Sequence, residues 1–95
     1  MLFRSFGPDG QLYVASADTD SVLRYDGSSG DFLEVFVDPA SGGLDLPRGL
    51  VFGPDGHLYV VSALTDGVLR YDGSTGAFLD AFVPSGSGEI GRAHV

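Results

Sequence analysis

The chain has no cysteine, no lysine and no asparagine, and it contains a single isoleucine. Without cysteine there is no disulfide, no thiolate nucleophile and no cysteine-based metal site. The chain also lacks a run of about 18 apolar residues, the length that a membrane-spanning helix needs, and residues 1–15 lack the basic start and apolar stretch of a signal peptide. Lysine, asparagine and isoleucine have codons rich in A and T, so their scarcity indicates a GC-rich, bacterial gene.

Positive charge is scarce as well. Five arginines stand against thirteen aspartates and glutamates, which gives a net charge of −8. A nucleic-acid-binding surface needs a basic stripe that neutralises phosphates, and anionic membrane surfaces attract basic segments. We therefore expect neither nucleic acid nor a membrane among the partners of this protein.

The composition is otherwise that of a small globular chain. Of its 95 residues, 43% are apolar and 19% are charged, which excludes a disordered chain. This length suits one small domain or a piece of a larger one. Fifteen glycines and five prolines indicate many turns rather than long helices.

An internal repeat dominates the sequence. The pentapeptide FGPDG stands at Phe6–Gly10 and again at Phe52–Gly56, an offset of 46 residues. The match runs without a gap from Phe6–Val37 onto Phe52–Val83, and 24 of these 32 positions are identical. Repeats of this period are typical of solenoids and propellers.

Each copy of the repeat is predicted to form four antiparallel strands joined by tight turns. In the turn Gly53–Gly56, proline presets φ at the second position and Gly56 supplies a positive φ. Short runs rich in β-branched and aromatic residues lie between such turns. The expected strands are Phe3–Phe6, Gln11–Ser16, Ser21–Tyr25 and Asp31–Val37, then Arg48–Phe52, Leu58–Ser62, Val68–Tyr71 and Ala77–Val83.

Two of the expected strands have apolar residues at successive positions, Leu12–Ala15 and Leu58–Val61. This pattern predicts sheets that are covered on both faces. We therefore expect an all-β fold built from two four-stranded antiparallel blades of an incomplete β-propeller. Residues 2–47 would form the first blade and its linker, residues 48–83 the second blade, and residues 84–95 a linker and tail. A two-sheet sandwich is the alternative, and the repeat period favours the propeller.

The segments Leu46–Val60 and Thr65–Tyr71 resemble an NHL-type repeat, and the wider similarity is to the TolB-like six-bladed propeller superfamily. The resemblance covers nearly all of residues 2–83. It implies a ring of six blades and leaves the exact family open, because NHL repeats usually carry aspartate where Ser16 and Ser62 stand. The superfamily includes streptogramin lyases and gluconolactonase-like enzymes.

The last seven residues depart from the repeat. At the offset of 46, Gly43–Gly49 should recur at Glu89–Val95, yet no position matches. The heptapeptide corresponds to the translation GAG-ATC-GGA-AGA-GCA-CAC-GTC, which resembles a short-read sequencing adapter. We expect a read artefact, with a natural chain that continues past Gly88. The alternative to the artefact is a degenerate natural tail. The alternative to a fragment of a longer gene is a natural half-unit that assembles as a homotrimer.

The motifs that suggest chemistry have structural explanations. GPDG lacks the lysine and the following helix of a phosphate-binding loop. Asp18–Asp20 and Asp26–Asp31 lack the spacing of a calcium loop, and aspartate suits turns by bonding its own backbone. His57 beside its turn is expected at the surface. Ser16 and Ser62 have no His–Asp partner nearby in sequence, so no catalytic, cofactor-binding or metal-binding residue is assigned.

Other repeated residues are expected to support the fold. The guanidinium groups of Arg24 and Arg70 are expected to pair with Asp26 and Asp72 or with loop carbonyls. The five repeated aromatic pairs are expected to fill the core between the blades: Phe6 and Phe52, Tyr13 and Tyr59, Tyr25 and Tyr71, Phe32 and Phe78, and Phe36 and Phe82.

The loops that differ between the copies are the expected functional surface. In a propeller, the Asp38–Pro47 linker and the loops Asp18–Ser21 and Leu64–Gly67 converge on one face, and loops on a rigid scaffold carry function. The candidate residues are Asp18, Asp20, Asp66 and Arg48. The first hypothesis is a non-catalytic binding or interaction scaffold for a protein, small-molecule or carbohydrate ligand. The alternative is a lyase or lactonase whose catalytic residues lie in missing blades. The expected partners of the two sheets are other blades of the same chain. Residues 1–95 alone are not expected to be a stable monomer: they should aggregate, stay loosely folded, or close a ring, for example as a homotrimer of two-bladed units.

Overall fold

The computed structural model describes residues 2–84, so the predicted artefact at Glu89–Val95 lies outside the described residues. Within that range no helix is long and apolar enough to cross a membrane. Eight strands and one 3₁₀ turn are seen in this part of the chain: β1 (Leu2–Phe6), β2 (Leu12–Ser16), β3 (Ser21–Tyr25), β4 (Phe32–Val37), η1 (Ser41–Gly43), β5 (Pro47–Phe52), β6 (Leu58–Ser62), β7 (Gly67–Tyr71) and β8 (Phe78–Val83).

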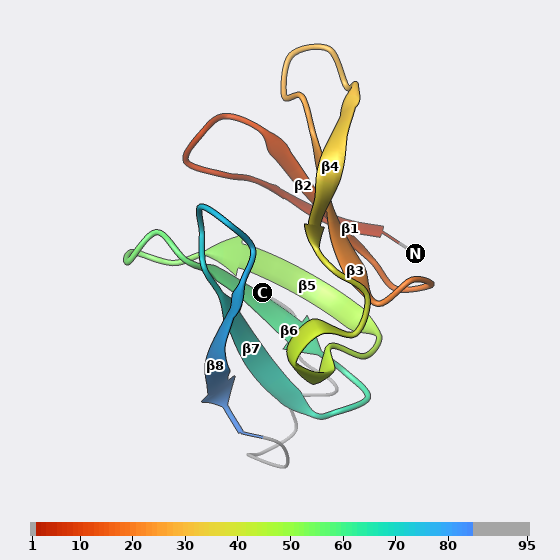
Figure 1. The fold of residues 1–95 in the computed structure, drawn as a ribbon, viewed down its shortest axis with the longest axis vertical. Coiled ribbons are helices and arrows are strands. Elements are labelled where there is room, and N and C mark those ends of the chain that lie inside the picture. Colours follow the sequence, from red (N-terminus) through yellow and green to blue (C-terminus); the bar gives the residue numbers. More distant parts are fainter. Residues whose placement is uncertain (1, 85–95) are drawn as a thin grey trace.

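The strands form two four-stranded antiparallel sheets, in the orders β1-β2-β3-β4 and β5-β6-β7-β8 (Figure 1). The expected all-β class, the two meanders and the strand positions are confirmed, with strand ends that differ from the expectation by one residue. The two sheets also share their irregularities. The β3–β4 pairing shifts between Val22 and Leu23, and the β7–β8 pairing shifts at the equivalent place, between Val68 and Leu69.

The GPDG turns have the geometry that their residues require. Gly10 and Gly56 adopt φ values of 80° and 81°, in the left-handed region that favours glycine. The amide of Gly56 donates to the carbonyl oxygen of Gly53 at 3.0 Å, and Gly10 donates to Gly7 in the same way. The predicted positive φ at Gly56 is therefore confirmed.

His57 has a structural partner, which corrects the expectation of a plain surface residue. It is half-buried, and its Nδ1 accepts a hydrogen bond from the backbone amide of Gly73 at 3.1 Å. At the equivalent position Gln11 accepts from the amide of Gly27 through Oε1 at 2.8 Å. His57 and Gln11 thus have the same structural role. His57 links the β5–β6 turn to the β7–β8 turn, and Gln11 links the β1–β2 turn to the β3–β4 turn.

This geometry predicts opposite outcomes for two adjacent substitutions. Gly56→Val should lower the free energy of unfolding by about 1–2 kcal/mol, because a β-branched residue resists positive φ. His57→Gln should change it by less than about 0.5 kcal/mol, because the amide oxygen of glutamine can accept the same bond. Urea unfolding of the two variants checks the prediction, and equal losses would refute the assigned role of the turn.

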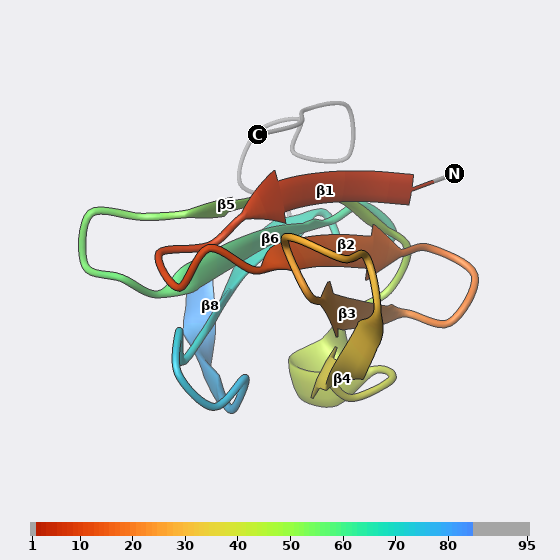
Figure 2. The ribbon, with the colours of Figure 1, turned by 90° about the horizontal axis from the view of Figure 1, so that it is seen from above.

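The two sheets pack face to face around one core. The first sheet contributes Tyr13, Ala15 and Val22, and the second contributes Leu58, Val60 and Tyr71, all of them buried. Figure 2 shows that the sheets lie closest where β1 runs beside β5 and that they diverge toward β4 and β8. The pair of sheets is therefore a wedge, with its narrow edge at the first strand of each repeat.

Only four of the ten repeated aromatic side chains, Tyr13, Phe36, Phe52 and Tyr71, belong to or pack against this core, so that expectation is wrong for the other six. Phe36 is 6% exposed, whereas its counterpart Phe82 is 55% exposed. Tyr71 is fully buried, whereas Tyr25 is half-exposed. In these two pairs the cause is position rather than residue type, because only one face of each sheet has the other sheet beside it; Phe32 and Phe78 are exposed in both sheets.

Candidate functional site

The loops that differ between the two repeats meet at one end of the wedge. The linker between β4 and β5 lies between the β2–β3 and β6–β7 loops and is hydrogen-bonded to both. On one side, the amides of Ala40 and Leu46 donate to the carbonyl and the carboxylate of Asp20, at 2.9 and 2.8 Å. On the other side, the amides of Ala63 and Leu64 donate to the carbonyls of Leu46 and Asp45, at 3.1 and 3.2 Å. We call these three segments, residues 17–20, 38–47 and 63–66, the loop end.

Buried serine hydroxyl groups at the ends of β2 and β6 form hydrogen bonds to residues of the loop end. Ser62 Oγ accepts from the amide of Asp45 at 2.9 Å and donates to the carbonyl oxygen of the same residue at 3.2 Å. Thr65 Oγ1 lies 2.6 Å from Ser62 Oγ, and Thr19 and Ser16 form the equivalent contact at 2.8 Å. Since Ser62 is fully buried, these bonds satisfy polar groups that would otherwise be costly to bury. The serines at this position thus have a structural role.

Backbone geometry also marks the loop end. Asp20, Leu46 and Asp66 have φ values of 53°, 54° and 56°, which non-glycine residues rarely adopt. Leucine has no side-chain hydrogen bond that would favour this φ. Leu46 is instead held by two backbone hydrogen bonds: its amide donates to Asp20, and its carbonyl accepts from the amide of Ala63. Such strained residues are found where the surrounding structure fixes them, often at functional sites.

The four candidate residues occupy different settings at this end. Asp20 is half-buried, and its carboxylate accepts from the amide of Leu46, so it connects two loops. Asp66 is half-buried, and its amide donates to the carbonyl of Ala63 at 3.2 Å. Asp18 is exposed, and Arg48 is exposed on β5 where the β5–β6 register shifts. The structure therefore gives Asp20 a structural role and leaves Asp18 and Arg48 open to a ligand.

A second polar cluster was not predicted. Arg24 Nη1 lies 2.7 Å from Glu34 Oε2, and Arg24 Nη2 lies 3.2 Å from Asp9 Oδ2. The hydroxyl of Tyr13 donates to Asp9 at 2.8 Å. The expected pairing of Arg24 with Asp26 is therefore wrong. The carboxylate of Asp26 instead accepts from the amides that follow it in its own turn.

The second repeat contains the same cluster. Arg70 contacts Asp80 at 2.7 Å and Asp55 at 3.3 Å, and Tyr59 donates to Asp55 at 2.7 Å. Arg70 also lies 5.5 Å from the ring centroid of Phe82. The expected pairing of Arg70 with Asp72 is wrong for the same reason as in the first repeat, because Asp72 accepts from the amides of its own turn.

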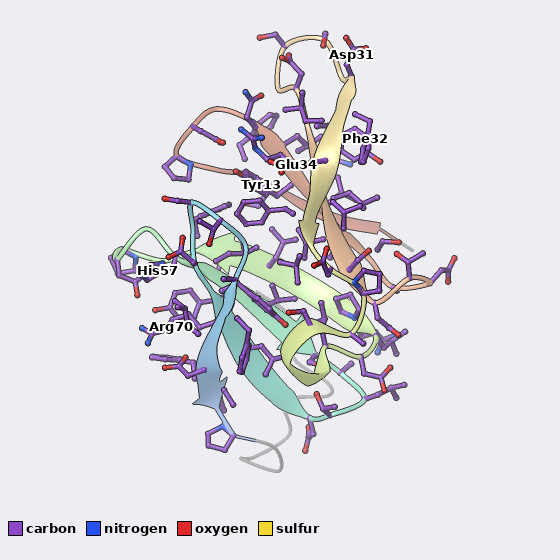
Figure 3. All side chains as sticks on the ribbon, in the orientation of Figure 1. Tyr13, Asp31, Phe32, Glu34, His57 and Arg70 are labelled. Carbon is purple, nitrogen blue, oxygen red and sulfur yellow. The ribbon has the colours of Figure 1, made fainter. Side chains whose placement is uncertain are left out.

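The two clusters differ in their surroundings. The first lines a cleft of about 380 Å³ that Gly73 and Ser74 of the second sheet close from the other side. The second lies on the outer face of the second sheet. Figure 3 shows Tyr13 and Glu34 on the side that faces the second sheet, and Arg70 beyond that sheet. The strand register could have revealed both clusters, because it places Tyr13 opposite Arg24 and Arg24 opposite Glu34.

The clusters shift the pKa values of their members. Burial, together with the hydrogen bond to Asp9, raises the pKa of Tyr13 to about 12. Burial alone would raise the pKa of Asp9, but hydrogen bonds from the amide of Gln11 and from Tyr13 and Arg24 lower it. Hydrogen bonds from Tyr59 and the amide of His57 lower the pKa of Asp55. Backbone amides lower the pKa values of Asp26 and Asp72.

These shifts predict acid sensitivity. A carboxyl group whose folded-state pKa lies below its unfolded value of 3.8 contributes stability above that value, and the contribution is lost as pH falls through the folded-state pKa. The melting temperature should therefore stay level from about pH 6 to pH 4.5 and fall steeply below about pH 4. Asp26→Asn and Asp72→Asn should flatten the fall. A melting temperature that rises on acidification would contradict this prediction.

A comparison with known proteins does not identify the chain. No family model and no curated protein matches it. Among residues 2–84, no group of three or more histidine, aspartate or glutamate side chains is placed as metal ligands would be. The proposals below therefore depend on the geometry of the loop end and of the two sheets.

Proposed function

We propose that the two sheets are consecutive blades of an NHL-like β-propeller. Three observations support this assignment. The sheets are meanders of the same strand order, they follow one another at the repeat offset, and they pack as a wedge whose narrow edge is formed by β1 and β5. In a propeller, blades of four strands surround a central channel. The first strand of each sheet would line that channel, and the loop end would form one of its two rims.

We further propose that the protein is a non-catalytic interaction scaffold that binds its ligand at the loop end. The observation that carries this proposal is how polar side chains are distributed between the repeats. Arg24 and Arg70, which recur at one repeat position, each pair with two acidic side chains of their own sheet, so each cluster serves its own sheet. At the loop end the two equivalent loops differ at one position, with exposed Asp18 in one and exposed Leu64 in the other, on a backbone held by hydrogen bonds.

Charge indicates which ligands suit the loop end. Its three segments carry five aspartates and no arginine, and Arg48 follows directly after the linker. An acidic surface attracts cationic partners and repels anionic ones. Carboxylates and loop carbonyls also accept hydrogen bonds from hydroxyl groups. We therefore expect the scaffold to bind a basic segment of a protein or a hydroxyl-rich carbohydrate.

An NMR titration of the ¹⁵N-labelled chain tests the proposal. The probes are a short arginine-rich peptide, a neutral glucose oligosaccharide and a polyglutamate peptide. We expect one of the first two to shift amide signals at residues 17–20, 38–48 and 63–66, and polyglutamate to shift none. Asp18→Asn should weaken the response, whereas Asp31→Asn, at an exposed turn of the opposite end, should not (Figure 3). Shifts centred on the Asp9–Arg24 cleft, or no shifts with any probe, would overturn the assignment.

A further inference from the structure

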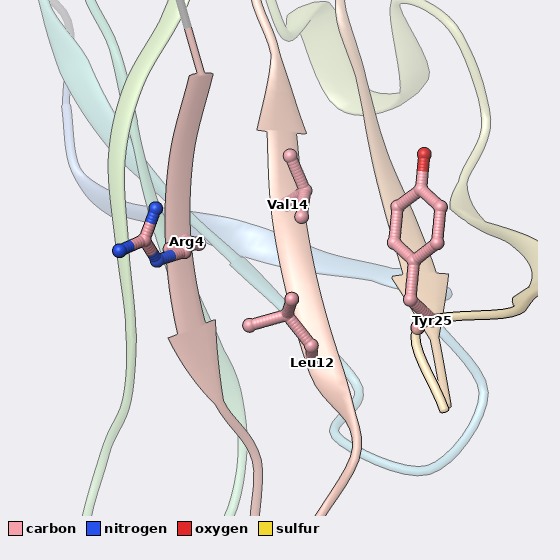
Figure 4. A pocket seen from close by; sticks show the side chains of 5 residues that line it. Arg4, Leu12, Val14 and Tyr25 are labelled. Carbon is pink, nitrogen blue, oxygen red and sulfur yellow. The ribbon is translucent and has the colours of Figure 1, made fainter. Parts of the chain in front are cut away.

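Each sheet has an outward face that the other sheet does not cover. Outer face 1, on the first sheet, carries Arg4, Phe6, Leu12, Val14 and Tyr25, and four of these residues line a hollow of about 270 Å³ (Figure 4). Outer face 2, on the second sheet, carries Val51, Tyr59, Val68, Phe82 and Val83, which line a hollow of about 440 Å³. Phe6 and Phe82 are 62% and 55% exposed, so both faces offer aromatic surface to solvent. Exposed apolar surface of this kind marks association sites.

The internal repeat relates each outer face of one sheet to the inner face of the other sheet. Outer face 1 has the residues of the inner face of the second sheet: Phe6, Leu12, Val14 and Tyr25 stand where Phe52, Leu58, Val60 and Tyr71 stand in the core. Outer face 2 has the residues of the inner face of the first sheet: Tyr59, Val68, Phe82 and Val83 stand where Tyr13, Val22, Phe36 and Val37 stand. The two outward faces are therefore copies of the two surfaces that already pack together inside the molecule.

The aromatic contacts show that outer face 2 is already arranged for this packing. At the inner interface, the ring of Tyr13 meets Phe36 at 4.9 Å and 82° and meets Phe52 of the other sheet at 4.8 Å. On outer face 2, Tyr59 meets Phe82 at 5.0 Å and 86°, the same edge-on geometry. Two rings of the three-ring group are thus in place, and only the ring that corresponds to Phe52 is missing. The residue at that repeat position is Phe6, on outer face 1.

The turn glycines give an independent indication. Gly76, in the β7–β8 turn, is buried so closely against the carbonyl of Phe36 that a Cβ atom there would overlap it. Gly30, at the equivalent turn of the first sheet, has a similar φ of 79° but is exposed, with nothing within 4 Å of a Cβ built there. Gly76 packs against Phe36 of β4. If Gly30 packs in the same way, its neighbour is the repeat equivalent of that segment, which is Phe82 of β8.

We propose that a second copy of this chain docks head to tail, with its outer face 1 against outer face 2 of the first copy. Phe6 of the second copy then completes the ring group of Tyr59 and Phe82, and the turn at Gly30 of the second copy lies against β8. Two residues of these faces depart from the match. Arg4 has Leu50 as its counterpart and lines the hollow of outer face 1, and Val51 on outer face 2 has Ser5 as its counterpart. The contact is heterologous, so it closes a ring or extends a filament.

The docking itself does not depend on the proposed function, because it follows from the observed contact between the two sheets. The number of copies does depend on the propeller assignment. If six sheets close the ring, three copies form it. A ring of another size would contradict the six-bladed assignment and leave the docking intact.

Because the contact joins two different faces, blocking either face alone should stop assembly. Phe6→Asp blocks outer face 1, and Phe82→Asp blocks outer face 2. Sedimentation equilibrium of the wild-type chain should show a discrete species above the 9.9 kDa monomer. Each variant alone should sediment as a monomer. Phe6→Asp retains an intact outer face 2 but has no intact outer face 1 to bind it, and the reverse holds for Phe82→Asp. Leu64→Asp, at a residue that is 67% exposed and lies on neither face, is the matched control and should assemble as the wild type does.

Mixing the two variants is the decisive step. Phe6→Asp retains outer face 2 and Phe82→Asp retains outer face 1, so an equimolar mixture should form a 1:1 dimer and nothing larger. Circular dichroism of each variant confirms that it is folded. A wild-type chain that stays monomeric at high micromolar concentration would overturn the proposal. So would a single variant that still dimerises, which indicates contact between like faces, or a folded pair that fails to form the mixed dimer.

Discussion

Replacing Tyr13 by alanine should lower the free energy of unfolding by about 3–5 kcal/mol, the range typical of a large aromatic side chain lost from a core. Tyr13 is 2% exposed, its ring contacts Phe36 and Phe52 from both sheets, and its hydroxyl bonds Asp9. Without this side chain, the first sheet would lose its main contact with Phe52 and leave a cavity between the sheets.

Tyr59 is the matched control, because it occupies the same repeat position, makes the same hydroxyl bond and contacts the equivalent phenylalanine. It is half-exposed, so Tyr59→Ala should cost the monomer about 1 kcal/mol. Urea unfolding should be measured in the Phe6→Asp background, in which assembly adds nothing to stability. Equal losses at the two tyrosines would contradict the observed packing of the sheets.

The second large effect is expected at Gly76. A Cβ atom there overlaps the carbonyl of Phe36, which is backbone and cannot swing aside. Gly76→Val should therefore separate the β7–β8 turn from β4. In Gly30→Val the same side chain enters the equivalent turn at a φ of 79°, against 78° for Gly76, with open space around it. Both variants carry the cost of a valine at positive φ, so the difference between them isolates the clash.

We expect Gly76→Val to be less stable than Gly30→Val by about 1–3 kcal/mol, the usual cost of forcing extra atoms into a packed region. Thermal and urea unfolding in the Phe6→Asp background measure this difference. If the two variants lose the same stability, the turn of the second sheet does not lie against β4 and the wedge is wrong.

Much of the fold could be predicted from the sequence because the strongest local signals occur twice. The GPDG turns fix the first hairpin of each sheet through a glycine at positive φ, and Asp26 and Asp72 fix the third turn through bonds to their own backbone. The strand limits were missed by one residue at Asp31 and Ala77, because their carbonyls accept from Asp26 and Asp72 and belong to the turn.

What could not be predicted depends on contacts between distant residues. The partner of Arg24 was sought two residues away at Asp26, whereas the pairing of β3 with β4 places Glu34 opposite it and the β1–β2 turn brings Asp9 within reach. The exposure of the repeated aromatics was unpredictable for a similar reason. Phe36 and Phe82 occupy the same repeat position in similar segments, FLEVFV and FLDAFV, yet Phe36 faces the other sheet and is buried whereas Phe82 is exposed.

The meeting of the three loops could be predicted from the sequence, whereas the hydrogen bonds that join them could not. The three variable loops do meet, because the linker bonds to both of the others. Asp20 was one of the four candidate loop residues, and its carboxylate accepts a hydrogen bond from the amide of Leu46. No local signal shows that bond, since the two residues are 26 positions apart. The polar cluster around Arg24 was missed because its members come from three strands and a turn.

The central claim is that the inner contact between the sheets is the template for both outer faces, and NOE contacts between aromatic rings test it most directly. In the monomeric Phe6→Asp variant, we expect contacts between the rings of Tyr13 and Phe52, whose centroids lie 4.8 Å apart, and between those of Tyr59 and Phe82, at 5.0 Å. In the 1:1 mixture with Phe82→Asp, a new contact should join Tyr59 of the first variant to Phe6 of the second. Absence of the Tyr13–Phe52 contact in the folded monomer, or of the Tyr59–Phe6 contact in a mixed dimer, would contradict the account.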